Sequence, residues 1–243
     1  MRIGAAQPPE ILGDVDAAVR VVQDLAAGAE ADLLVFPECF LQGYLVTEEH
    51  VHRQAFTLGS PGFAEVLARL AGIRPILVLG LIERDGDAYH NTAVTVRAGR
   101  VVSRYRKTFL TDGEQVFTPG QGYPVLEHGG LRFGVNICYD VQFPEAAAGV
   151  RAGGAQVLLV PAQNMMRRTK AFDWQPRHTE IGARRARETG LWLVRSDVTG
   201  ERGDTHLALG PTSIMTPAGE VVTQVPTGTV GVVTAEIYPA AAS

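Results

Sequence analysis

Short apolar segments alternate with amphipathic segments in the first third of the chain. Residues 2–6 and 32–36 are short and mainly apolar, as expected of buried β-strands, whereas the apolar positions of 16–29 recur at helical spacing. A second helical pattern at 63–71 precedes another apolar run at 76–82. This order predicts strands separated by helices, which is typical of layered α/β proteins.

The middle of the chain predicts antiparallel strands joined by tight turns. Aspartate and glycine dominate residues 85–87, and residues 98–100 are Ala-Gly-Arg. Because aspartate and glycine tolerate the backbone angles of tight turns, both segments predict hairpins. So many strands with so few helices favour two packed sheets covered by helices over one open parallel sheet. The remaining expected strands are 91–96, 101–106, 131–138, 156–160, 191–197, 213–215, 221–225 and 230–236, and the remaining helices are 144–152 and 179–188.

The chain is long and apolar enough to form one large core. It has 243 residues, of which 46% are hydrophobic, and a chain of this size commonly folds as one layered domain. The sequence contains no repeat, linker or low-complexity tract that would indicate a further domain. We therefore expect a single α/β domain over residues 1–243.

Charge and cysteine content argue against several classes of partner and cofactor. The formal net charge of -4 gives no field that would attract nucleic acid or an anionic membrane, so a small molecule is the expected partner. Two cysteines are too few for a disulfide framework. The six histidines lack the paired spacing of metal sites, so we expect no metal and no cofactor.

The amino-terminal segment and the apolar runs predict a soluble, cytoplasmic protein. The first ten residues, MRIGAAQPPE, are strand-like and lack a basic segment followed by an apolar one, so we expect no signal peptide. Every apolar run is shorter than the ~20 residues that a membrane-spanning helix requires.

The segment GVNICYDVQFPE, residues 134–145, places a cysteine at the end of a predicted strand. An isolated cysteine in an apolar run is most often a packing residue. Side chains alternate along a strand, so Cys138 should share the less apolar face of 131–138 with Arg132 and Asn136. Cys138 is therefore a candidate nucleophile as well as a candidate core residue.

Two further strand ends carry polar residues that could take part in chemistry. Glu38 follows the apolar run 33–36 and Lys107 follows the strand 101–106, and each alone is typical of a solvated surface residue. A thiol is mostly protonated at neutral pH, so a nucleophilic cysteine needs a base, which Glu38 could provide. Attack on an amide carbonyl builds negative charge on oxygen, and Lys107 with the backbone N–H of Tyr139 could stabilise it.

Three motifs resemble those of the nitrilase-like carbon-nitrogen hydrolases and occur in that family's order. They are FPECFLQGY at 36–44, YRKTFL at 105–110 followed by GEQVFTPG at 113–120, and GVNICYDVQFPE at 134–145. Weaker matches extend the resemblance over nearly the whole chain: HNTAV at 90–94, RARETGLWLV at 185–194 and TPAGE at 216–220. The sequence contains no G-x-S-x-G elbow, H-E-x-x-H motif or phosphate loop, so rival catalytic motifs are missing.

The resemblance implies a fold, an assembly and a catalytic set. The family's fold is a four-layer α-β-β-α sandwich that pairs into at least a dimer, so we expect a homodimer or a larger homo-oligomer. The family's catalytic glutamate, lysine and cysteine match Glu38, Lys107 and Cys138. Its second glutamate matches Glu114, which would position the lysine or the substrate nitrogen. Cys39 is expected to be a packed neighbour that points away from the base.

Departures from the family's pattern affect the substrate rather than the catalytic set. Many amidase members carry arginine where this chain has Gln142, and asparagine where it has Thr189. Because Gln142 supplies no cation, neutral amides should compete well with carboxylate-bearing ones unless Arg167 or Arg168 provides the charge from a neighbouring loop. Substrate contacts are expected from four residues: Tyr44, Gln142, Gln163 and Asn164.

Together these features predict a cofactor-independent, cysteine-dependent hydrolase of small-molecule amides that acts through a thioester. N-carbamoyl amidase and nitrilase activities are alternatives on the same scaffold, although CYDxxFPE resembles the amidase and carbamoylase forms more closely. A subunit that delivers ammonia or an acyl group to a partner enzyme is an alternative of another class, and we expect no appended synthetase domain. A redox sensor or binding protein that joins Cys39 and Cys138 in a disulfide is a third.

Overall fold

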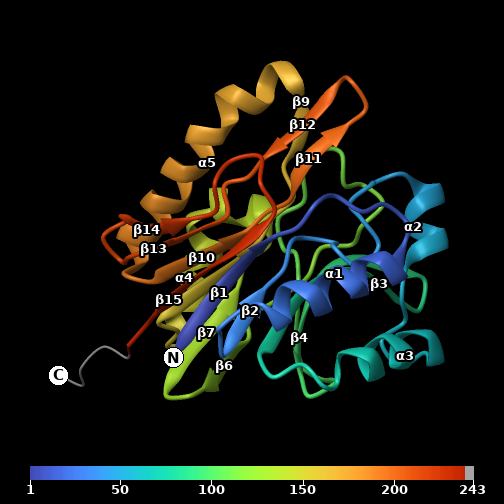
Figure 1. Ribbon diagram of the computed structural model, residues 1–243, viewed down its shortest axis with the longest axis horizontal. Coiled ribbons are helices and arrows are strands. Elements are labelled where there is room, and N and C mark those ends of the chain that lie inside the picture. Colours follow the sequence, from blue (N-terminus) through green and yellow to red (C-terminus); the bar gives the residue numbers. More distant parts are fainter. Residues whose placement is uncertain (239–243) are drawn as a thin grey trace.

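Two mixed six-stranded sheets pack face to face (Figure 1). The structure is a computed structural model that describes residues 1–238, so the last five positions of the predicted domain, 239–243, lie outside the described residues. The strands of the first sheet are β1 (Arg2–Gln7), β2 (Leu33–Val35), β3 (Ile76–Asp85), β4 (Ala88–Arg97), β5 (Arg100–Arg106) and β15 (Gly231–Glu236). Their order is β15-β1-β2-β3-β4-β5, with β1, β2 and β3 parallel and the remaining neighbours antiparallel.

The second sheet repeats this plan with a parallel centre and antiparallel edges. Its strands are β6 (Val125–His128), β7 (Leu131–Val135), β8 (Val157–Pro161), β10 (Trp192–Ser196), β13 (Ser213–Met215) and β14 (Val221–Gln224). They follow the order β14-β13-β10-β8-β7-β6, in which β7, β8 and β10 are parallel. A small third sheet joins β11 (Thr199–Arg202), β12 (His206–Leu209) and β9 (Met165–Arg167).

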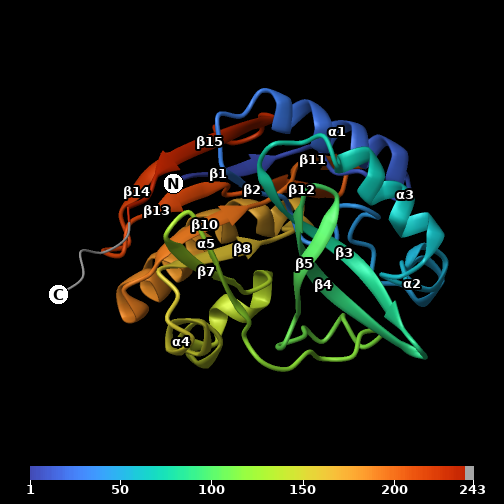
Figure 2. The same cartoon turned by 90° about the horizontal axis from the view of Figure 1, so that it is seen from below.

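Strand alternation explains why both faces of each large sheet are buried. In β2, Leu33 packs between the sheets, whereas Leu34 belongs to the cluster under the outer helices. In β8, Leu159 packs between the sheets and Leu158 faces the helices on the other side. Strands covered on both faces read as continuous apolar runs, which is the pattern of the sequence. The resulting order of layers is α-β-β-α, as predicted (Figure 2).

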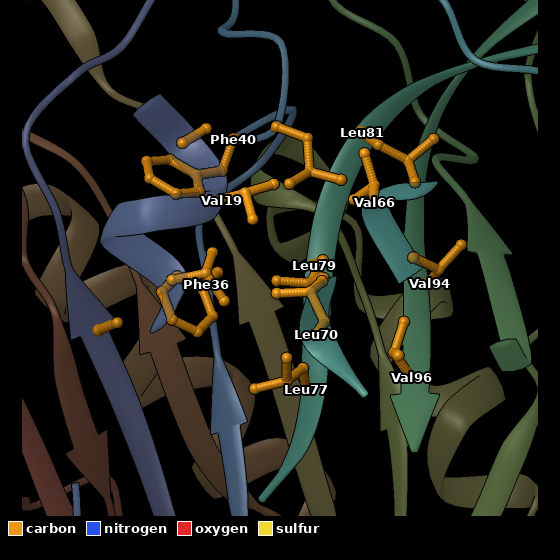
Figure 3. Packing of buried hydrophobic residues seen from close by; sticks show 14 of the residues in the cluster. Val19, Phe36, Phe40, Val66, Leu70, Leu77, Leu79, Leu81, Val94 and Val96 are labelled. Atoms are coloured by element: carbon orange, nitrogen blue, oxygen red, sulfur yellow. The ribbon is translucent and has the colours of Figure 1, made fainter. Parts of the chain in front are cut away.

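Helices α1 (Val15–Ala27) and α3 (Pro61–Leu70) cover the first sheet. The Asp14 side chain caps α1 by accepting a hydrogen bond from Ala17 N at 2.9 Å, and α3 begins with a proline, whose missing N–H is not needed at that position. Both helices turn an apolar stripe toward strand residues such as Leu79, and Figure 3 shows Val19 and Leu70 in this layer. Helices α4 (Pro144–Ala152) and α5 (Arg168–Thr189) cover the second sheet. Within the described chain, no helix has the length and apolar character needed to cross a membrane.

Both predicted hairpins are present. Asp85 pairs with Ala88 across the first turn, and Arg97 pairs with Arg100 across the second. Gly99 has a φ of 70° there, in the left-handed region that glycine adopts without a steric penalty. The turn residues therefore set the register of β3, β4 and β5.

Several elements differ from the sequence-based expectation. Helix α5 begins at Arg168, eleven residues before the expected start at 179. The sequence did not predict this first half, because only Ala171 and His178 are buried in it and no apolar stripe marks it. Strand β7 ends at Val135, so the predicted alternation does not reach Cys138. The short helix α2 (Glu48–Gln54), a 3-10 helix η1 (Cys138–Gln142), and strands β6, β9, β11 and β12 were not expected.

Gly80 of β3 lies so close to neighbouring backbone atoms that even one added methyl group should disturb the fold. A Cβ there would lie 2.2 Å from Pro37 O and 2.4 Å from Cys39 N, both of them backbone atoms that cannot move away freely. Gly80→Ala should lower the free energy of unfolding by about 1 to 3 kcal/mol and displace the adjacent Glu38 segment. Gly62→Ala is the matched control, because no atom lies within 4 Å of its added Cβ and alanine favours the helix. Equal denaturation midpoints for the two variants would contradict this interpretation.

Candidate active site

The predicted site residues come from both sheets and meet at one end of the sandwich. Glu38 follows β2, Lys107 directly follows β5, and Cys138 opens η1 after β7. A backbone hydrogen bond of 3.3 Å from Glu38 N to Ala162 O links the two sheets at this end. Lys107 and Cys138 line one cavity of about 260 Å³, so the structure brings the proposed cation and nucleophile to a common space.

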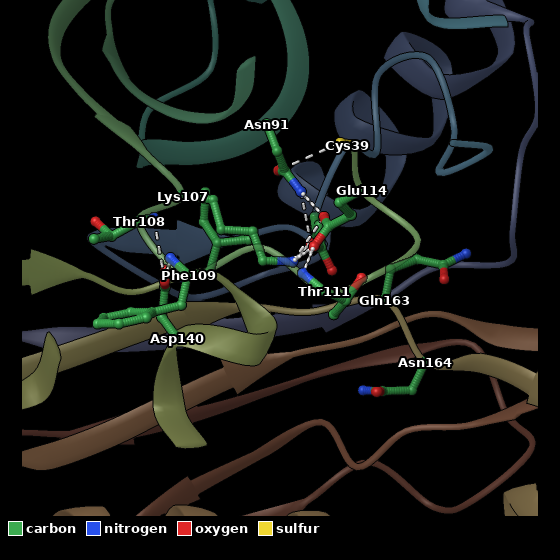
Figure 4. A network of polar contacts seen from close by, with 12 residues as sticks. Cys39, Asn91, Lys107, Thr108, Phe109, Thr111, Glu114, Asp140, Gln163 and Asn164 are labelled. Carbon is green, nitrogen blue, oxygen red and sulfur yellow. Dashed lines mark hydrogen bonds and ion pairs between the residues drawn. The ribbon is translucent and has the colours of Figure 1, made fainter. Parts of the chain in front are cut away.

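The Lys107 ammonium lies between two carboxylates (Figure 4). Its Nζ donates to Glu38 Oε1 at 2.7 Å and to the two oxygens of Glu114 at 2.8 and 2.9 Å. All three side chains are at most 1% exposed. Asn91 Nδ2 bridges the carboxylates by donating to Glu38 Oε1 at 2.7 Å and Glu114 Oε1 at 3.0 Å. Such a buried network holds its members rigidly because each shared contact limits the others.

The two glutamates differ in protonation tendency. Burial raises the pKa of Glu38, with a further contribution from the neighbouring Glu114, although Lys107 opposes the rise. Burial also acts on Glu114, but Lys107 and the backbone N–H of Thr111 hold the pKa of Glu114 below its usual value. Glu38 Oε2 is buried and has no hydrogen-bond partner within residues 1–238. Glu38 is therefore the carboxylate with both a raised pKa and a free oxygen.

Cys138 is held in an unusual backbone conformation. Its φ of 44° lies in the left-handed region, which is disfavoured for a residue with a Cβ and persists only where the surrounding structure imposes it. Burial raises the pKa of the Cys138 thiol, and Glu38 adds to the rise, whereas Lys107 lowers it. The thiol is thus protonated at neutral pH, and attack requires a base to accept its proton.

Asp140 connects the segment that carries Lys107 to the segment that carries Cys138. Its Oδ1 accepts hydrogen bonds from the backbone N–H groups of Thr108 and Phe109 at 3.2 and 2.8 Å. Its Oδ2 accepts from Ile137 N and from the Tyr105 hydroxyl, both at 2.8 Å. Four donors on one fully buried carboxylate join β5 to the end of β7. Asp140 therefore positions the lysine relative to the cysteine.

Asp140→Asn should reduce both stability and turnover. The amide nitrogen of asparagine cannot accept hydrogen bonds, so two buried donors lose their acceptor at a cost of about 1 to 3 kcal/mol in the free energy of unfolding. A shift of the lysine by ~1 Å should lower kcat roughly a hundredfold with a smaller change in KM. Asp112→Asn, at an exposed position five residues after Lys107, is the control and should change neither quantity. A kcat for Asp140→Asn equal to that of the control would rule out the positioning role.

The expected substrate contacts line the same cavity as Lys107 and Cys138. The four residues are Tyr44, Gln142, Gln163 and Asn164. Tyr139 also lines it, and its backbone N–H lies in the first turn of η1, where N–H groups have no acceptor within the helix. These placements agree with the predicted contacts and oxyanion donor, whose roles stay predictions.

Cys39 lies behind the site rather than in the cavity. It is fully buried in a cluster with Val51, Ile82 and Phe117. Its Sγ contacts Asn91 Oδ1 at 3.4 Å, and burial raises the pKa of the Cys39 thiol well above its ordinary value. Both cysteines are free in this structure.

Three site residues were not identified from the sequence. Asn91 lies in the HNTAV segment, where only a weak motif match marked it. His178 lies on the unexpected first half of α5, and Arg195 lies in β10. An arginine inside the apolar run LWLVRS is a detectable signal, because burying a charge is costly unless a partner compensates it.

Sequence comparison finds relatives over most of the chain. The profile of the carbon-nitrogen hydrolase family matches residues 2–243. The "Hydrolase in pqqF 5'region" of Pseudomonas protegens is 33% identical over 172 residues, which are 68% of this chain and 60% of that protein. The glutamine-dependent NAD(+) synthetase of Rhodobacter capsulatus is 33% identical over 203 residues, which are 82% of this chain and 36% of that protein. The match therefore spans less than two thirds of each of these two relatives.

Structure comparison gives the same family. An amidase from Nesterenkonia sp. has a TM-score of 0.82 and 28% identity, with coverage of 98% of this chain and 90% of that one. One variant of that amidase was solved with acrylamide added at its active site cysteine, and another in complex with butyramide. The predicted fold and family are confirmed, and the chain belongs to the carbon-nitrogen hydrolase family.

Proposed function

We propose that this enzyme is a cysteine-dependent amidase that converts a small-molecule amide into a carboxylic acid and ammonia or an amine. The observation that carries the proposal is the unpartnered Oε2 of Glu38, on a carboxylate whose pKa is raised and whose charge in turn raises the pKa of the Cys138 thiol. A base with a raised pKa accepts a thiol proton more readily than an ordinary surface carboxylate. The Lys107 ammonium supplies the positive charge that stabilises the oxyanion formed during acyl transfer.

The first half of the reaction forms a thioester. Glu38 takes the Sγ proton of Cys138 as the sulfur attacks the carbonyl carbon, and the carbonyl π electrons move to oxygen. Lys107 Nζ and the Tyr139 N–H donate to that oxyanion. Glu38 then gives its proton to the nitrogen, the C–N bond breaks, and ammonia or an amine leaves. Glu114 keeps the ammonium in place through its two contacts of 2.8 and 2.9 Å.

The second half hydrolyses the thioester. A water molecule attacks the carbonyl carbon while Glu38 accepts one of its protons, and the same two donors hold the oxyanion. When the C–S bond breaks, the proton passes to sulfur, which regenerates the thiol and releases the carboxylic acid. No redox step or external co-reactant besides water is required.

Butyramide hydrolysis tests the proposal, because a similar amidase was solved with that amide. The purified protein should release ammonia and butyrate in equal amounts, faster than it releases ammonia from butyronitrile or N-carbamoyl-β-alanine. Iodoacetamide at a stoichiometric amount should inactivate it and modify Cys138 in peptide mapping. Faster turnover of the nitrile or the carbamoyl compound would replace amidase with the corresponding alternative.

An ammonia-delivering subunit is the second candidate, because the glutamine-dependent NAD(+) synthetase of Rhodobacter capsulatus is 33% identical over 203 residues. An independent amidase should release ammonia steadily in isolation. A delivery subunit should instead hydrolyse glutamine slowly until its partner enzyme is added. Rates measured on the isolated chain with glutamine and butyramide distinguish the two.

A homodimer or larger homo-oligomer is part of the proposal. Exposed apolar side chains, including Phe172 on α5 and Val222 on β14, support it because they are 64% and 51% exposed in the single chain. Light scattering at micromolar concentration should report at least twice the chain mass. A fully active monomer would contradict the assembly without affecting the proposed chemistry.

A further inference from the structure

Two polar side chains lie in the otherwise largely apolar wall that α5 and β10 contribute to the cavity. They are Arg195 of β10 and His178 of α5, and neither takes part in the proposed reaction steps. Their apolar neighbours in the cavity lining are Met165, Met166, Trp174 and Ile181. Polar groups within an apolar pocket commonly fix the orientation of a ligand.

The Arg195 guanidinium is buried with most of its donors unused. The residue is 2% exposed, and a guanidinium carries five N–H donors. Among residues 1–238, its one hydrogen bond runs from Nη1 to the His178 carbonyl at 3.4 Å, and Nε has no acceptor. The nearest carboxylate oxygen, Asp197 Oδ2, is 3.7 Å from Nε, which is too far for a hydrogen bond.

Asp197 accepts no hydrogen bond from Arg195, because its oxygens accept hydrogen bonds from other groups. Its Oδ1 accepts hydrogen bonds from the backbone N–H groups of Asn164 at 2.9 Å and Val198 at 3.0 Å. Its Oδ2 accepts from the Asn164 side-chain amide. The negative charge of Asp197 thus offsets part of the cost of burying the Arg195 cation, but Asp197 does not accept hydrogen bonds from its N–H groups.

His178 adds a neutral polar atom beside this cation. The residue is 8% exposed, and its Nε2 is buried without a partner in the described part of the chain. Burial and the charge of Arg195 lower the pKa of His178 to about 3, so the ring is neutral at physiological pH. A neutral imidazole carries one N–H, which is available to an oxygen acceptor when it resides on Nε2.

We propose that Arg195, with His178 beside it, binds a carboxylate at the end of the substrate remote from the scissile amide. The preferred substrates are then short amides that carry a terminal carboxylate. A planar carboxylate matches the guanidinium fork and supplies the two hydrogen-bond acceptors that Arg195 lacks. The cavity of about 260 Å³ is smaller than typical drug-sized sites, which limits the chain length.

This inference changes the expectation that neutral amides compete well, which rested on Gln142 alone. The cation comes from a strand of the second sheet instead of position 142. Arg167 and Arg168, the alternatives suggested by the sequence, line a separate surface pocket with Phe172. The inference also rests on the proposed function, because it concerns the acyl part of the same substrate.

Three four-carbon amides test the anchor on the wild-type enzyme. Succinamate carries the terminal carboxylate, butyramide replaces it with a methyl group, and succinamide replaces it with a neutral group of the same shape. The value of kcat/KM, counted per scissile amide, should be at least about tenfold higher for succinamate than for either neutral compound, as expected for charge-assisted hydrogen bonds. A succinamate value equal to or below the neutral ones would overturn the proposal without any variant.

Arg195→Gln should lower the ratio of succinamate to butyramide kcat/KM about 10- to 100-fold, mainly through the KM for succinamate. The ratio is the correct measure, because Arg195 also lowers the pKa of Cys138 and its loss can change all rates together. Arg195→Lys keeps the charge but not the fork and should lie between the two. Arg167→Gln, at an exposed position outside the cavity, is the matched control and should keep the wild-type ratio. A lowered ratio in the control alone would assign the anchor to Arg167.

Direct binding separates failure of the anchor from failure of the proposed function. Calorimetry on Cys138→Ala should show tighter binding of succinamate than of butyramide, and the Cys138→Ala/Arg195→Gln double variant should lose that preference. If the wild type hydrolyses butyramide but none of these preferences is found, the anchor is wrong and the amidase proposal stands. If the binding preference depends on Arg195 but no amide is hydrolysed, the anchor stands and the amidase proposal fails.

Discussion

Cys138→Ala should abolish amide hydrolysis, with a loss of roughly 10⁶-fold or to the detection limit, as expected when a nucleophile is removed. The substitution removes the sulfur that must bond to the carbonyl carbon, and no other side chain in the cavity replaces it in the proposed mechanism. Ammonia release from butyramide measures the loss. Intact-protein mass spectrometry with an activated ester should find an acyl adduct on the wild type and none on the variant.

Cys39→Ala is the matched control for this experiment. It removes the chain's other thiol, which is fully buried in a separate cluster and lies outside the cavity lining. Most activity should remain, and the adduct should still map to Cys138. An adduct on Cys39, or undiminished turnover by Cys138→Ala, would overturn the mechanism.

Lys107→Ala should lower kcat/KM at least a hundred- to a thousandfold, the usual effect of removing one oxyanion donor. The loss should exceed a binding defect, because the ammonium stabilises charge that develops only in the transition state. The variant also leaves Glu38 and Glu114 buried without their shared cation, so a decrease of about 3 to 5 kcal/mol in the free energy of unfolding is expected. Steady-state kinetics and chemical denaturation measure the two effects separately.

Lys170→Ala controls for the loss of a lysine. Lys170 is the only other lysine of the chain and is exposed on α5. Its removal should leave both kcat/KM and stability close to wild type. If Lys107→Ala retains more than a tenth of the wild-type kcat/KM, the ammonium is not the main oxyanion donor.

The outline of the fold was predictable because hydrophobic burial leaves a periodic signal. Strands such as β1, β3 and β8 are covered on both faces, so they read as short continuous apolar runs. The hairpin turns were predictable from glycine and aspartate. Elements such as β9 and β12 gave little signal, because they have only three and four residues and their paired residues are 39 to 43 positions apart in the sequence.

The composition of the candidate site was also largely predictable. Glu38, Lys107 and Cys138 follow strands where polar side chains can face a cleft, and the motifs that resemble the carbon-nitrogen hydrolases add Glu114. The structure brings the first two together across 69 positions of sequence. The chemistry of a thiol, a base and a cation was therefore available from residue types and motif order.

Only the tertiary structure decided how these groups are charged, braced and oriented. Glu38 and Glu114 are the same residue type, yet their pKa values shift in opposite directions, because burial prevails at Glu38, whereas the contacts with Lys107 and the Thr111 N–H prevail over burial at Glu114. Asp140 braces the site by accepting hydrogen bonds from residues more than 30 positions away in the sequence. The Arg195 side chain is buried where its Nε has no acceptor among residues 1–238. A sequence determines which polar side chains exist, whereas their pKa values and free hydrogen-bonding groups depend on distances and burial that arise when the sheets pack.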